Sequence, residues 1–596
     1  MDGARREKQM ADEFKAIVRL KASERRERRW TQGNDTDDVE MEESQQQQNN
    51  SDQQYVNTGD SSSRSQASRT AAEPTGDNEK NGSSLGAQLS STSSYHDDSA
   101  TNSLIPPSPV PPSPATSNTR PEAVAIETMP PLSDLSTFPD DKSEREINST
   151  MVYLDYVVPF LFPFYHPCLL ESSRGWLLVL LMKNKTLFHT ALSLATYSYS
   201  VLLDGALGHH GPCRAANWAE LQTQQELSIK ALQRDMSDLN TRGVASAFKE
   251  SVNCLESIIQ LLAFEMAVAS TENRHVHLDA AVVLFNQLIA NHATDCAGPW
   301  FSILRQLGPS HLQVSLGHRR HPWSSEQSAF RFYTAQLLWI DILAATAAGA
   351  PPKLRGYHAE LLEGDPPHLR LDEYVGCHNW AVLRIAEIAE LDAWKKGMRA
   401  SGSLSVVELV QRADRVEAKI RLSMRDLASS PMERLANIFD PSAQAPYLQI
   451  PGLSIGTTAD VSMQIATAVA LHTNMWAQAA LTYLAVVVSG FQPGLPDIRS
   501  SVQSTVDLMH LLKSPLCIRT MVWPFAVTGC LASPEQESFF HDLINGIGPM
   551  KVFGSVEEAS NIMQSVWGHR KSGCIDAQSW DAAACLGVLG HRALLA

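Results

Sequence analysis

The chain has 596 residues and a formal net charge of −16, which is spread unevenly along it. Residues 1–30 carry 10 basic and 6 acidic side chains, residues 31–146 carry 6 basic and 20 acidic ones, and residues 147–596 have a net charge of −6. Affinity for duplex DNA comes largely from clustered Lys and Arg. Residues 147–596 are mildly acidic, which argues against a broad phosphate-binding surface outside the first thirty residues.

The nine cysteines are widely spaced, because the closest pair, Cys574 and Cys585, is eleven residues apart and no Cys-x-x-Cys occurs. This spacing does not fit a cysteine-ligated metal site or the dense disulfide framework of a small secreted protein. Scattered thiols among apolar neighbours, such as Cys530 in GCLA, are typical of small buried hydrophobes. The chain starts without an apolar signal-peptide core, and its longest uncharged span, 461–496, is too polar for a membrane helix. The sequence predicts an intracellular protein that does not enter a membrane.

The first segment, residues 1–30, has the pattern of a short basic helix with a weakly apolar face. Its last part, SERRERRW from Ser23, places four arginines in five positions: Arg25, Arg26, Arg28 and Arg29. Such a cluster is a candidate nuclear-import signal or set of phosphate contacts, and a solvated helix end fits it equally well. Sequence-specific reading of DNA needs a rigid element that presents side chains to base edges, and this segment alone supplies none.

Residues 31–146 are a low-complexity acidic segment rich in Ser, Gln and Pro, with stretches such as QQQQNN and PPSPVPPSP. So few apolar side chains cannot offset the entropy of ordering, which predicts a disordered linker. Near its end, PPLSDLSTFPDD (130–141) alternates Leu and Phe with Asp. That composition is typical of a disordered activation segment, and an ordinary acidic linker is an equally good interpretation.

The composition changes abruptly after residue 146, and apolar residues then recur at helical spacing. Helical patterns cover the stretches around Leu255 to Met266, Phe330 to Ala348, Trp380 to Trp394, Leu404 to Leu422 and Val469 to Val488. Pro- or Gly-bearing breakers such as GAPP at Gly349 separate them, and strand alternation is nearly absent. The pattern predicts one large all-α, multi-helix domain over residues 147–596, preceded by a long disordered region.

No stretch of the sequence carries a recognisable catalytic or cofactor-binding motif. The common signatures of hydrolases, nucleotide-binding proteins and zincins are missing. His275 and His277 lie two residues apart, so on a helix they point in nearly opposite directions and do not share a metal. The sequence nominates no catalytic, cofactor-binding or metal-binding residue, and nothing in it argues for an enzyme.

Several stretches of the helical region, in order along the chain, resemble one family: the fungal zinc binuclear cluster transcription factors with a large fungal-specific helical domain. They are MVYLDYVVPFLFPFYHP from Met151, SRGWLL from Ser173, FRFYTAQLLWIDILAATAAGAPP, HNWAVLRIAEIAELDAWKKG, VVVSGFQPGLPDIRSSV, VWPFAVTGCLA, SVWGHRK and GHRALLA. The resemblance spans roughly residues 150–596. It implies a nuclear regulator of RNA polymerase II transcription whose helical domain is regulatory, often dimeric, and able to sense small molecules.

The sequence departs from the family pattern in one respect. Members carry six N-terminal cysteines that hold two zinc ions and read DNA, whereas the first cysteine here is Cys168, so no zinc ligand can be assigned. Residues 1–18 resemble the segment that follows the cluster in the family. We therefore expect weak or indirect DNA binding, through a longer form of the chain or through a homo- or heterodimeric partner. The alternative is an intracellular helical metabolite-binding protein or enzyme with no direct role in transcription.

Overall fold

The computed structural model describes residues 141–167, 174–207, 211–292, 298–309, 323–364, 366–428, 458–512, 514–574 and 580–596. Over these residues it contains nineteen α-helices, α2 to α20, and no strand. One isolated bridge pairs Gly364 with Pro367. The predicted all-α class is therefore confirmed for the described part of the chain. The predicted basic helix of residues 1–30 and nearly all of the predicted linker, up to residue 140, lie outside the described residues.

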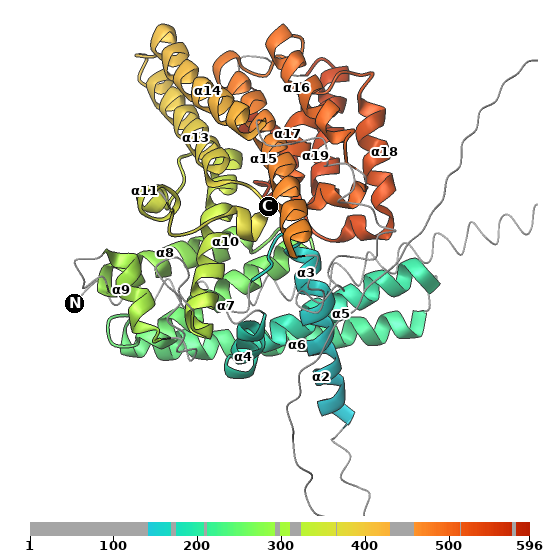
Figure 1. Ribbon diagram of the computed structural model, residues 1–596. Helices are drawn as coiled ribbons and strands as arrows, with labels where there is room; N and C mark the ends of the chain where they lie inside the picture. Colours follow the sequence, from blue (N-terminus) through green and yellow to red (C-terminus); the bar gives the residue numbers. More distant parts are fainter. Residues whose placement is uncertain are drawn as a thin grey trace, which may run out of the picture. The chain divides into compact units, whose positions relative to one another are not determined.

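The helices of the first half begin with α2 (Asp141–Val152), which continues through a π-helical turn, η2 (Tyr153–Val157), into α3 (Val158–Leu161). The others are α4 (Gly175–Lys183), α5 (Lys185–Leu207), α6 (Gly211–Arg242), α7 (Phe248–Ala267), α8 (Arg274–His292), α9 (Pro299–Gln306) and α10 (Ser325–Ala348). The long helices α5 and α6 run side by side, as do α7 and α8 (Figure 1). Helix α2 starts at Asp141, within the stretch that the sequence assigned to the linker.

Short helices connect to the second half: η4 (Arg355–Tyr357), α11 (His358–Leu362) and α12 (Asp372–Val375). The longer helices that follow are α13 (Asn379–Ala400), α14 (Val406–Ala428), α15 (Thr458–Ser489), α16 (Pro496–Met509), α17 (Val522–Cys530), α18 (Glu537–Ile547) and α19 (Val556–Lys571). The 3-10 helix η7 (Pro515–Thr520) precedes α17, η8 (Gly548–Val552) precedes α19, and α20 (Ala582–Leu586) lies near the end of the chain. Helices α13, α14 and α15 pack against one another (Figure 1).

Helix α10 is the central helix of the core. Between Gln327 and Ala347 every side chain except Arg331 is buried. Local chemistry fixes both ends. Ser324 and Gln327 form a reciprocal capping box at the start, and Gly349 takes a left-handed φ of 58° at the end, which a side chain would disfavour. The predicted stop at Gly349 is confirmed, and the helix begins five residues before the predicted Phe330.

Three tryptophans join α10 to the second half of the domain. Trp476 on α15 makes an edge contact with Trp339 on α10, with ring centroids 4.4 Å apart, and stacks on Trp523 of α17 at 5.6 Å. The indole N–H of Trp523 donates to Thr346 Oγ1 at 2.8 Å, so its polar end is satisfied inside the core. Packed rings of this size restrict movement between α10, α15 and α17, and they make Trp339 a rigid wall for the space beside it.

Candidate ligand pocket

A pocket of the described residues lies where segments from both halves of the chain meet α10. It encloses about 890 Å³ of empty space, including the space open to solvent at its mouth. The lining comes from the end of α3 and its loop, from α7, α10, α12 and η7, and from residues 553–556 before α19, with Ala596. A concave, mainly apolar space between several elements is the usual form of a site for a small organic molecule.

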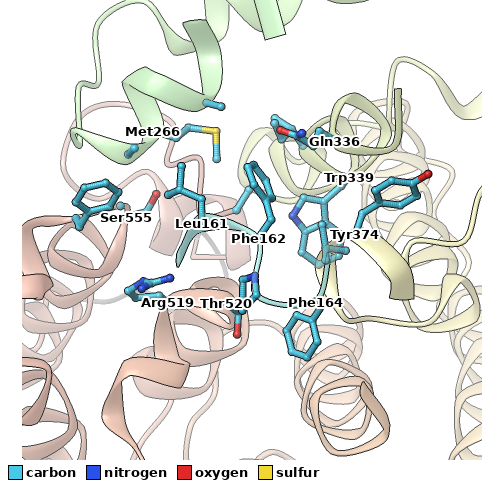
Figure 2. Close-up of a pocket in the computed structure, with 18 of the residues that line it drawn as sticks. Leu161, Phe162, Phe164, Met266, Gln336, Trp339, Tyr374, Arg519, Thr520 and Ser555 are labelled. Atoms are coloured by element: carbon cyan, nitrogen blue, oxygen red, sulfur yellow. The ribbon is translucent and has the colours of Figure 1, made fainter. Parts of the chain in front are cut away.

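Most of the pocket wall is apolar, and much of it is aromatic. The aromatic lining residues are Phe162, Phe164, Trp339, Tyr374 and Phe553. Figure 2 shows the side chains of Phe162, Phe164, Trp339 and Tyr374 around the space, with Trp339 and Tyr374 on the side of α10 and α12. Aromatic rings offer large contact area at a low cost in conformational entropy, and they favour flat apolar partners.

The position of Phe164 depends on a glycine. Gly376 has a φ of 74°, and a Cβ atom added there would collide with the Phe164 ring. Only glycine combines this left-handed backbone with the absence of a side chain. Gly376 therefore allows Phe164 to pack against the end of α12 and to form one wall of the pocket.

Four polar side chains interrupt the apolar wall: Gln336, Arg519, Thr520 and Ser555. Ser555 Oγ donates to the Leu594 carbonyl at 3.0 Å, and Thr520 Oγ1 donates to the Cys517 carbonyl at 2.9 Å. The Arg519 guanidinium donates to the Phe160 carbonyl and lies over the Phe160 ring. Gln336 differs, because its amide nitrogen Nε2 is buried and has no hydrogen-bond partner among the described residues.

A buried histidine lies directly behind this wall. The His472 ring packs 4.8 Å from Phe164, Nδ1 lies 2.9 Å from the Gly376 carbonyl oxygen, and Nε2 lies 2.9 Å from the Thr520 carbonyl oxygen. Burial lowers the pKa of His472 to about 4, although the two carbonyl contacts act in the opposite direction. The imidazole is therefore neutral at physiological pH and carries one N–H. The Trp476 indole N–H donates to Nε2 at 3.3 Å, so the ring hydrogen lies on Nδ1 and donates to the Gly376 carbonyl of the pocket wall.

The histidines considered in the sequence serve separate roles. His275 Nε2 lies 2.9 Å from the Arg592 carbonyl oxygen, and His277 Nδ1 lies 3.0 Å from Glu265 Oε2. The two rings thus have different partners, as their spacing predicts. Among the described residues no group of three or more His, Cys, Asp or Glu side chains could hold a metal ion. Arg25, Arg26, Arg28 and Arg29 lie outside the described residues.

The described cysteines are free thiols. Five are buried, namely Cys254, Cys377, Cys517, Cys530 and Cys585, whereas Cys574 is exposed. Burial raises the pKa of the Cys254, Cys517 and Cys530 thiols to about 12, so they are inert at neutral pH. The prediction of small buried hydrophobes is confirmed for these five. Along the described parts of the chain, no helix is both long and apolar enough to cross a membrane.

The sequence nominated no residue of the pocket. The lining residues are far apart in the chain, as Phe162 and Phe553 illustrate, and no motif or periodicity links them. One local signal existed, because Gln336 is a polar residue within the otherwise apolar run TAQLLWIDIL. The sequence could not show that its amide lacks a partner.

The sequence matches the fungal specific transcription factor domain over residues 150–596. The chain belongs to this family. Family membership confirms the resemblance drawn from the sequence and establishes a role in transcriptional regulation, and the intracellular enzyme or metabolite-binding alternative is not favoured. No solved structure matches the chain.

Named relatives in the family are regulators of fungal genes. The chain is 34% identical to the transcription factor dibT of Pestalotiopsis microspora, over 77% of this chain and 72% of dibT. It is 29% identical to the trichothecene biosynthesis transcription regulator TRI10 of Trichoderma arundinaceum, over 69% of this chain and 88% of that protein. It is 27% identical to TRI10 of Fusarium sporotrichioides, over 74% of this chain and 96% of that protein.

Proposed function

We propose that this family member controls transcription of the genes of a fungal biosynthetic pathway from within the nucleus. The observation that carries the proposal is the family match over residues 150–596, taken together with relatives named as regulators of biosynthesis. RNA polymerase II transcribes such genes, so the helical domain would act on that machinery.

We further propose that the chain reaches its target genes through a partner or a longer form. Its first cysteine is Cys168, so residues 1–167 contain no zinc-cluster ligand. The TRI10 relative of Fusarium sporotrichioides is matched over 96% of its own length, so nearly all of that regulator corresponds to sequence in a chain that lacks a six-cysteine cluster. This supports a regulatory role that lies in the helical domain, with the DNA contact supplied by a longer form of the chain or by a related transcription factor.

The proposed role is regulatory rather than enzymatic, and the perturbed carboxyl groups support this. Burial raises the pKa values of Asp341 and Asp392. Each has a structural partner, because Asp341 Oδ2 accepts from the Leu354 backbone N–H at 2.8 Å and Asp392 Oδ2 accepts from Lys396 Nζ at 2.7 Å. Neither residue lines the pocket. These two carboxyl groups thus stabilise the core and do not form part of the pocket.

Purified chain 1–596 is expected to bind duplex DNA weakly and without sequence preference, with a Kd of about 1–100 µM at physiological salt. We expect the N-terminal basic cluster to make most of the phosphate contacts, so changing Arg25, Arg26, Arg28 and Arg29 to Ala should flatten the salt dependence, by up to about 0.9 in logarithmic slope per arginine. Fluorescence anisotropy on promoter duplexes of the regulated pathway, repeated over a salt series, measures both quantities. A matched control changes four exposed arginines of α14 to Ala: Arg412, Arg415, Arg421 and Arg425.

Nanomolar, sequence-specific binding by the purified chain at physiological salt would contradict the need for a partner.

The same four-alanine variants, carrying a fluorescent tag, also test nuclear import. If the basic cluster is the import signal, its four-alanine variant accumulates in the cytoplasm while the α14 control stays nuclear. Equal nuclear fractions for both variants would remove that role from the cluster.

A further inference from the structure

We infer that the pocket beside α10 binds a small, mainly apolar organic compound, and that a neutral carbonyl-type oxygen of this compound accepts a hydrogen bond from the Gln336 amide. This inference goes beyond the proposed function, since it concerns binding by the purified chain and does not depend on what the chain does at a promoter. It names a ligand site, its donor and the chemical class of its ligand.

The side-chain amide of Gln336 lacks a hydrogen-bond partner for its nitrogen. The Gln336 side chain is 3% exposed, and its Nε2 has no hydrogen-bond partner among the described residues. Leaving a buried donor unpaired costs more than an average hydrogen bond contributes, so such groups are rare and call for a physical explanation. An acceptor oxygen delivered by a ligand would satisfy this donor.

Two other buried glutamines of the same core show what is missing at Gln336. Gln260 Nε2 donates to Tyr153 Oη at 2.9 Å, and Gln260 Oε1 accepts from Tyr333 Oη at 3.0 Å. Gln327 Nε2 donates to the Leu304 carbonyl at 2.8 Å, and its Oε1 accepts from the Ser324 backbone N–H at 2.9 Å. Both of these amides are paired at both ends. Gln336 is the one of the three that borders the pocket, which makes the pocket the place for its partner.

The lining of the pocket is mainly apolar. Aromatic and aliphatic side chains make up most of the lining, and Trp339 is held in place by its contact with Trp476. A flat apolar compound would bury its surface against these rings. The space that the centre of a water molecule can reach is about 120 Å³, several times what one water needs, so it is large enough for an organic molecule that displaces several waters.

The charged groups of the described lining are few. It contains no Asp or Glu side chain, and its one basic side chain, Arg519, lies across the pocket from Gln336 (Figure 2). The lining also includes Ala596, whose terminal carboxylate offsets the guanidinium charge, so the lining favours a ligand without net charge. Gln336 itself is set among apolar groups, where an uncompensated anion would be costly. The oxygen at Gln336 is therefore best supplied by a neutral ketone, quinone, ester or lactone.

The test uses a pair of probes that differ only at the acceptor. The ketone 2-acetonaphthone carries a carbonyl oxygen, and 2-isopropenylnaphthalene has the same shape with a CH₂ group in its place. Equilibrium dialysis against the full chain measures the affinity of each probe. We expect saturable binding of the ketone, about three- to tenfold tighter than binding of the alkene, which is the range that one neutral hydrogen bond provides.

The change Gln336→Leu removes the amide and should abolish the preference for the ketone. The matched control is Thr334→Val, because Thr334 lies on the same helix, is 1% exposed, has an unpartnered Oγ1 and does not line the pocket. Thr334→Val should keep the wild-type ratio of affinities. Without ligand, Gln336→Leu should melt at the wild-type temperature or above it, because a buried unpaired donor is removed. Absence of saturable ketone binding by the wild type, or the same affinity ratio in Gln336→Leu, would overturn the inference.

Discussion

Replacing Arg274 with Met is expected to lower the free energy of unfolding by about 3–5 kcal/mol, the range for removing one partner of a buried ion pair. Arg274 is 1% exposed at the start of α8, and its Nη1 donates to Glu558 Oε2 on α19 at 2.8 Å. His591 Nε2 lies 3.0 Å from the other carboxylate oxygen. The ion pair and His591 thus connect α8, α19 and the last residues of the chain. The substitution leaves the Glu558 carboxylate, which is only 6% exposed, without its arginine partner.

Two comparisons separate this effect from a general loss of side-chain packing. The double change Arg274→Met with Glu558→Leu removes both charges, and it should recover most of the stability, because an apolar pair of similar volume costs little. Arg421→Met breaks an exposed pair with Glu417 on α14 and should cost less than about 1 kcal/mol. Urea denaturation followed by circular dichroism measures all three variants. If Arg274→Met costs no more than Arg421→Met, the buried pair does not hold these helices together.

Acidification is expected to destabilise the domain through His472 by about 3 kcal/mol between pH 6.5 and pH 4. The folded pKa is lowered from 6.5 to about 4, because burial disfavours the charged ring. Between these values the unfolded chain binds a proton that the folded chain does not. The stabilisation is therefore fully present above pH 6.5, and it is lost as the pH falls toward 4.

Buried carboxyl groups act in the opposite sense and must be separated from the histidine. Burial raises the pKa values of Glu256 and Asp392, so their contribution to stability decreases as the pH rises. The variant His472→Asn isolates the ring, since Asn retains a donor for the Gly376 carbonyl and does not titrate. Urea midpoints from pH 7 to pH 4 should fall more steeply for the wild type, by about one proton or 1.4 kcal/mol per pH unit. Parallel profiles for the two proteins would contradict a neutral, buried His472.

Much of the fold could be predicted from the sequence because its signals are local. The apolar run from Phe330 and the breaker at Gly349 predicted α10, and the Ser324–Gln327 capping box explains why the helix starts earlier. The predicted helix over 469–488 is the apolar part of α15, which starts at Thr458. Helix α2 extends back to Asp141 through a polar stretch that carries no apolar periodicity, so no local signal predicted it.

The pocket could not be predicted, because it depends on distances that only the folded chain sets. Phe162, Gln336 and Phe553 belong to segments nearly two hundred residues apart or more, and nothing in the spacing of residues brings them together. The family could be recognised from ordered stretches of sequence, since family resemblance needs no tertiary contact. The packing of the folded core determines whether a buried glutamine has a hydrogen-bond partner. Gln260 bonds to two tyrosine hydroxyl groups, whereas Gln336 Nε2 has no partner among the described residues.

The central claim is that this family member regulates the genes of a biosynthetic pathway through its helical domain. The most direct measurement is the transcript profile of the organism that encodes it, after deletion of the gene and after re-expression of residues 1–596. Deletion should change the transcripts of one set of clustered biosynthetic genes several-fold, and re-expression of this chain should restore them. An unchanged profile after deletion, or no restoration by residues 1–596 or by a longer form of the chain, would contradict the claim.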